Sequence, residues 1–345
     1  MAADRNRELP LMNFLQPAIT YLRELVRDAI AGWNHFWFTP ADPINVAVIR
    51  IITGLILLHT HLTTLPDLLD FIGPHAWIDS QALAELRSTP VGMENPGPDA
   101  WPGGEQSIWF YIQDPRWIWA WHALFLMAVV CFTLGLFSRT ASMIVWAGHL
   151  SYMQRGIVIA YGMDSVLVML TLYLMFAPTG AELSLDRWWR RWRTPAASAG
   201  HDEAQKSVAA NVVLRLLQLH LCLIYLFSGL SKLAGGAWWN GTAVYAALMI
   251  PEATLFDMAW MARRDWLWLW LSNAGSFATL ALELGFPIFV WHRRLRPLML
   301  AGAMAMQVGL GILLSLGAFQ AAMFAALCAF FPAQALRVVS RRRAE

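Results

Sequence analysis

Long apolar segments, each close to the length that crosses a lipid bilayer, constrain this chain more than any other feature. Apolar residues make up 58% of the chain and charged residues 14%, whereas soluble domains have about 45–50% and about 25%. A helix that spans a bilayer needs about 20 mostly apolar residues. The sequence therefore predicts an all-α, polytopic bundle of about eight spans, at residues 43–62, 117–137, 140–154, 157–177, 208–230, 267–291, 297–315 and 318–336. The third span is short and the fourth follows it at once, which predicts a tight hairpin or a partly re-entrant pair.

Basic residues alternate between the two sides of this predicted bundle. Of the 25 lysines and arginines, 17 fall on one side and six on the other, while Arg50 and Arg215 lie within spans. Cytoplasmic loops carry an excess of lysine and arginine. We therefore expect an integral multi-pass protein of a bacterial inner membrane, with both termini in the cytoplasm.

Three regions follow from this pattern. Residues 1–40 alternate polar and apolar residues at helical spacing, which predicts a cytoplasmic interfacial helix. Residues 41–336 form the transmembrane domain, with a flexible linker at 194–207, and residues 337–345 form a basic tail. The cysteines Cys131, Cys222 and Cys328 all fall in apolar segments, so we expect free thiols.

Lys232, one of only two lysines, closes a polar stripe on the fifth predicted span. The members of the stripe recur every three or four residues, which places them on one helical face: Arg215, Gln218, Cys222, Tyr225, Gly229 and Lys232. A partly desolvated lysine loses its proton more easily than one in water, so Lys232 is a candidate base. The alternative is a polar packing seam between helices.

Other ionisable residues fall at membrane depth, where they usually face the bundle interior. His61 shares a face with Arg50, Gly54 and Leu57, while Asp164 lies in the exterior half of the fourth predicted span. We expect Lys232, His61 and Asp164 to act together as a catalytic cluster, with Tyr225 nearby.

Three further assignments concern packing. Arg50 and Glu283 have opposite charges at similar depth, which favours a structural ion pair. His149 and His220 are interpreted as hydrogen-bonded packing residues rather than haem ligands.

Several motifs are absent. The sequence has no Walker loop, dinucleotide fingerprint, His-Glu-x-x-His site or Cys-x-x-Cys pair, so we expect no metal. The arginine runs fit topology signals better than nucleic-acid binding.

The segment Gly229-Leu-Ser-Lys232-Leu followed by Trp238-x-x-Gly241 resembles the signature of vitamin K-dependent gamma-carboxylases and the related HTTM-domain membrane proteins. Further blocks resemble that family in the same order over roughly residues 40–335: Val46-Ala-Val-Ile-Arg50, Gly135-Leu-Phe-Ser-Arg139, Leu183-Ser-Leu-Asp186 and Ser315-Leu-Gly-Ala-Phe319. Gln307 and Met163 stand where the family pattern has histidines.

The resemblance implies a lyase-like, quinol-dependent carboxylase or oxygenase. In that family a lysine, here Lys232, deprotonates a reduced quinone of the vitamin K or menaquinol type, and O2 and CO2 take part. We assign Tyr225, Gln307 and Trp238 to cofactor binding. The protein substrate would be a secreted peptide or protein met at the lipid bilayer. Two alternatives are a non-catalytic membrane partner for maturation, export or immunity of such a peptide, and a small transporter.

Overall fold

The computed structural model describes residues 8–78, 82, 107–156, 159–193, 205–250, 254–256 and 263–341. Within these ranges every regular element is a helix, and a single antiparallel bridge joins Ala41 to Ser207. The predicted all-α class is therefore confirmed. Most of the expected linker at 194–207, and residues 342–345 of the basic tail, lie outside the described residues.

The described helices fall into two groups by length. The longer ones are α1 (Glu8–Phe38), α2 (Ile44–Thr63), α5 (Pro115–Leu134), α6 (Ser138–Arg155), α7 (Gly162–Phe176), α10 (Val208–Leu233), α13 (Asp265–Phe289), α14 (Arg296–Leu313) and α15 (Gly317–Leu327). The shorter ones are α3 (Leu68–Ile72), α8 (Leu185–Arg193), α11 (Gly236–Trp239), α12 (Ala243–Leu248) and α16 (Ala333–Arg341), with 3-10 turns at Leu65–Asp67, Ile108–Phe110 and Cys328–Phe330.

Four of the described helices are long and apolar enough to cross a membrane: α2, α5, α10 and α14. Helix α7 and the run Gly317–Phe330 are apolar but shorter. The expected spans at 140–154 and 267–291 are present as helices α6 and α13, which are not in this apolar set. This composition indicates a membrane protein, and the total of eight spans stays a prediction.

The last expected span, 318–336, is not one helix. Helix α15 passes into the turn Cys328–Phe330, Phe331 is extended, and α16 begins only after Pro332. The proline explains this break, because the residue before a proline is disfavoured in the helical conformation.

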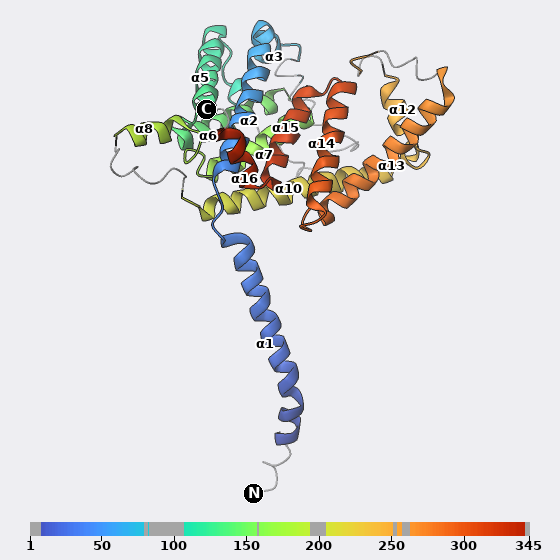
Figure 1. Ribbon diagram of the computed structural model, residues 1–345. Coiled ribbons are helices and arrows are strands. Elements are labelled where there is room, and N and C mark those ends of the chain that lie inside the picture. The colour runs from blue at the N-terminus through green and yellow to red at the C-terminus, as the bar shows by residue number, and fades with distance from the viewer. Residues whose placement is uncertain are drawn as a thin grey trace, which may run out of the picture.

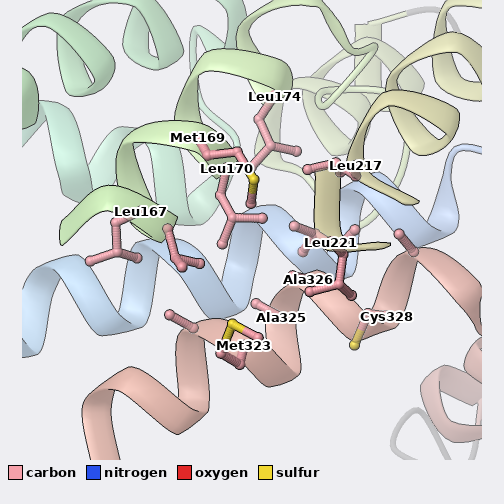
Figure 2. Close-up of a cluster of buried hydrophobic side chains, with 14 of the residues drawn as sticks. Leu167, Met169, Leu170, Leu174, Leu217, Leu221, Met323, Ala325, Ala326 and Cys328 are labelled. Atoms are coloured by element: carbon pink, nitrogen blue, oxygen red, sulfur yellow. The ribbon is translucent and has the colours of Figure 1, made fainter. Parts of the chain in front are cut away.

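The core of the bundle lies where α2, α7, α10 and α15 meet. Figure 2 shows leucines of α7 and α10 above Met323, Ala325 and Ala326 of α15, and all of these side chains are buried. Small alanines on α15 let the helices approach closely, which is how helices pack in membranes.

Helix α1 leaves this bundle and extends away from it (Figure 1). Only its C-terminal end is fixed: Asn211 of α10 donates to the carbonyls of Phe36 and Trp37, at 2.8 Å each. The guanidinium of Arg215 lies 4.4 Å from the ring centroid of Phe36. The side chains from Gln16 to Ala31 are exposed. The location of α1 at a membrane interface remains a prediction.

The prediction of an ion pair between Arg50 and Glu283 is wrong. Arg50 is completely buried, and its two terminal nitrogens donate to the carbonyls of Thr179 and Leu183, at 2.5 Å each. Gly135 makes room for this guanidinium, since it has a positive φ of 69° and a Cβ there would overlap Arg50 Nη1. Backbone carbonyls of the connection between α7 and α8 therefore take the place of the expected carboxylate.

Candidate functional site

A cavity of about 330 Å3 opens between α2, α3, α6 and α7. Much of its lining is apolar and includes Leu68, Phe71 and Ile72 of α3. The polar part of the lining includes His61, His122, His149, Tyr152, Tyr161 and Asp164, together with Asp67 and three threonines, Thr60, Thr63 and Thr64. Small-molecule sites in proteins are mostly apolar pockets with a few convergent polar groups, of about 300–1,000 Å3. This cavity has that character.

Three of its polar residues lie in a row. The Nε2 atom of His61 is 3.4 Å from Nδ1 of His149, and Nε2 of His149 is 3.9 Å from a carboxylate oxygen of Asp164. His61 and His149 are buried, so neighbouring helices fix their rings. The other oxygen of Asp164 accepts a hydrogen bond of 3.0 Å from the backbone N–H of Tyr161, which caps α7.

This row fixes how its protons can be placed. If Nε2 of His149 carries its proton toward Asp164, then Nδ1 of His149 is an acceptor for Nε2–H of His61. Nδ1 of His61 is then left with a free lone pair. The separation of 3.9 Å exceeds a hydrogen bond, and a movement of about 1 Å would close it. The arrangement can accept a proton at His61 and stabilise the resulting charge through Asp164.

A second polar pair borders the first. Nδ1 of His122 lies 2.6 Å from the Tyr152 hydroxyl, and the Tyr152 ring packs against His61 with centroids 4.6 Å apart. Nε2 of His122 is buried and has no hydrogen-bond partner among the described residues. His122 and Tyr152 were not predicted as site residues, and His149 was predicted to have a packing role only. The spacing of three between His149 and Tyr152, on one face of α6, is the signal that could have drawn attention to them.

Lys232 does not line this cavity, contrary to the expected cluster with His61 and Asp164. Its amine lies 2.6 Å from the Ser228 hydroxyl and 2.9–3.0 Å from the two carboxylate oxygens of Glu283 on α13. The helical face that carries Lys232 packs against α13, and this packing keeps Lys232 away from the cavity. The amine is therefore engaged with Ser228 and Glu283 at the contact between α10 and α13 and does not face the cavity.

Of the three expected cofactor-binding residues, Trp238 lies near Lys232, while Tyr225 of α10 and Gln307 of α14 contact each other. The Trp238 ring centroid is 5.3 Å from the Lys232 amine, in cation–π range. Gln307 Nε2 donates to the Tyr225 hydroxyl at 2.8 Å, and Tyr225 is buried with its ring centroid 4.5 Å from that of Phe286. Tyr225 and Gln307 therefore meet, as a buried bond between α10 and α14.

Other predicted features can be placed briefly. The Nδ1 atom of His220 is 3.0 Å from the Tyr173 hydroxyl, in agreement with its packing role. The cysteines are free thiols. Over the described ranges no group of three or more metal-ligating side chains has suitable geometry. Comparisons of the chain with protein-family models, with curated proteins and with solved structures give no match.

Proposed function

We propose that this chain is a membrane enzyme that removes a proton from a lipophilic, hydroxyl-bearing substrate in the cavity. The observation that carries the proposal is the row His61–His149–Asp164 beside an apolar cavity of about 330 Å3. A buried histidine backed by a carboxylate is a common arrangement for a general base. The apolar lining suits a substrate that arrives from the bilayer.

A reduced quinone is the substrate class that we favour. It combines an aromatic ring, which fits among Phe71, Leu68 and Ile72, with an acidic hydroxyl that a histidine can deprotonate. The resemblance to vitamin K-dependent gamma-carboxylases supports the same choice. In that family the deprotonated quinol reacts with O2. The oxygenated product is a base strong enough to remove a γ-proton from a peptide glutamate, and CO2 then adds to the resulting carbanion.

Each residue has a defined part in this proposal. His61 accepts the proton. His149 accepts a hydrogen bond from His61 and links it to Asp164, which fixes the tautomer of His149. Tyr152 and His122 hold the ring of His61 from the other side. Lys232, which the resemblance would make the base, is assigned instead to the contact between α10 and α13 through Glu283.

Quinol oxidation in reconstituted membranes tests this assignment. We expect His61→Gln and Asp164→Asn each to lower the rate of O2-dependent quinol oxidation by about 10²–10⁴-fold, the usual contribution of general base catalysis. His220→Gln is the matched control, because this histidine bonds to Tyr173 outside the cavity. The control should keep the wild-type rate, and all variants should keep the wild-type melting temperature.

Lys232→Met separates the two candidate bases. Full loss of quinol oxidation in Lys232→Met, with unchanged rates in His61→Gln and Asp164→Asn, would overturn the cavity proposal in favour of Lys232. Labelled CO2 added to the same assay tells a carboxylase from an oxygenase. If the wild type oxidises no quinol, the enzyme proposal fails and a non-catalytic peptide partner or a transporter takes its place.

The proposed location is a bacterial inner membrane, with both termini in the cytoplasm. The excess of basic residues on the side of the termini supports this orientation.

A further inference from the structure

Helix α8 separates its residues into two faces. A helix turns by 100° per residue, so Leu185, Trp188, Trp189 and Trp192 fall on one face and Arg187, Arg190 and Arg191 on the opposite one. The indoles of Trp188 and Trp192 are 59% and 68% exposed. Three tryptophans in nine residues therefore form an apolar surface that no described part of the chain covers.

On the polar face of α8, two arginines contact the connection that precedes the helix. Arg187 forms an ion pair with Glu182 and donates to the carbonyl of Ala181 at 2.9 Å. Arg190 donates to the carbonyl of Gly180 at 2.8 Å. A helix on the surface of a soluble protein has the opposite arrangement, with its apolar face inward and its charges in water. The orientation of α8 is reasonable only where the surroundings are apolar.

The beginning of α8 is fixed to the end of the apolar helix α5. The backbone N–H of Asp186 donates to the carbonyl of Gly135 at 3.0 Å. The Asp186 carboxylate accepts hydrogen bonds of 2.9 Å from the backbone N–H groups of Phe137 and Ser138. Burial alone would raise the pKa of Asp186, but these hydrogen bonds keep it below its ordinary value. Because α5 is long and apolar enough to cross the membrane, α8 lies where that crossing ends.

We propose that α8 lies on an anionic phospholipid surface, with Trp188, Trp189 and Trp192 inserted at the boundary between headgroups and acyl chains. Tryptophan is enriched at this depth of a bilayer. Four arginines against one aspartate give α8 an excess of positive charge that matches anionic headgroups. Figure 1 shows α8 projecting from the side of the bundle, so a flat surface can reach it.

Arg193 is the residue that we assign to the headgroups. It stands at the C-terminal end of α8, and its guanidinium lies 4.8 Å from the Trp189 ring centroid. Stacking on an indole keeps a guanidinium at the level of the tryptophans. This role is independent of the proposed enzyme activity.

A fluorophore at position 192 tests the location of α8. The full-length Trp192→Cys variant is labelled with an environment-sensitive dye and reconstituted into nanodiscs of phosphatidylcholine, with and without phosphatidylglycerol. Wild-type protein, whose cysteines are buried or half-buried, gives the labelling background. The control is Arg294→Cys, at an exposed position in the connection between α13 and α14. We expect quenching by lipid-borne nitroxide at position 192 and by aqueous iodide at position 294.

The charge of α8 is tested with Arg193→Gln in the same labelled protein. An arginine near an anionic surface strengthens the interaction roughly fivefold, so this change should lower the preference for phosphatidylglycerol by up to roughly fivefold. Iodide quenching at position 192 in both lipids would overturn the proposal. So would protection from both quenchers in a dimer, because a second copy would then cover the tryptophans. Lipid quenching without any effect of phosphatidylglycerol would overturn the anionic preference.

Discussion

Arg50 illustrates how a single buried charge can hold a connection between helices. Its guanidinium donates to two carbonyls between α7 and α8. Arg50→Met should lower the free energy of unfolding by about 2–6 kcal/mol, because each carbonyl left without a donor costs about 1–3 kcal/mol. Arg27→Met is the control, since Arg27 is exposed on α1. Thermal unfolding in detergent measures both, and equal midpoints in the two variants would contradict this role.

Sequence periodicity identified which side chains are buried better than it identified their partners. Arg50, Gly54, Leu57 and His61 were expected on one face, and all four are buried. The partners of Arg50 and Lys232 could not be predicted, because backbone carbonyls carry no sequence signal and the crossing point of α10 and α13 is set by packing. The row His61–His149–Asp164 was predicted only at its two ends for the same reason.

Between elements, the contact of α2 with α5 depends on a glycine. A Cβ at Gly54 would overlap the Thr133 hydroxyl and lie 2.9 Å from its Cβ. Gly54→Ala should therefore lower the free energy of unfolding by about 1–3 kcal/mol, the usual cost of overpacking. Gly309→Ala in α14 is the matched control, since no atom lies within 4 Å of its added Cβ. That change should be neutral or stabilising by up to about 1 kcal/mol. A stable Gly54→Ala protein would show that α2 and α5 can separate at little cost.

The existence of the apolar helices was predictable, and their ends and breaks were less so. Helices α2 and α5 lie within a few residues of the expected ranges 43–62 and 117–137. Pro332 itself signals the break between α15 and α16. The expected span 318–336 was based on apolar composition, which takes no account of a proline. The inverted polarity of α8 could not be predicted at all, since the sequence shows which residues share a face and not which face meets the protein.

At the scale of the whole molecule, an ion-pair network joins distant parts of the chain. Arg337 of α16 donates to both carboxylate oxygens of Asp42, which precedes α2, at 2.7 and 2.8 Å. It also donates to Glu182 at 3.1 Å, and Glu182 pairs with Arg187 of α8. The Asp42 hydrogen bond raises the pKa of Arg337, so this arginine stays charged at every pH at which the protein is handled. The network thus holds three parts of the chain together: the residues before α2, the connection before α8, and α16.

A double-mutant cycle on Arg337 and Asp42 measures this connection. Hydrogen bonds to charged groups contribute about 1.5–3 kcal/mol, and the two side chains are mostly shielded from water, at 16% and 17% exposure. We expect Arg337→Gln and Asp42→Asn each to lower the unfolding free energy by about that amount, and the double variant to lose much less than the sum of the two. Asp42→Asn removes the charge at the same side-chain size, and Arg337→Gln removes the charge and shortens the side chain. Strictly additive losses would mean that Arg337 and Asp42 act on stability separately.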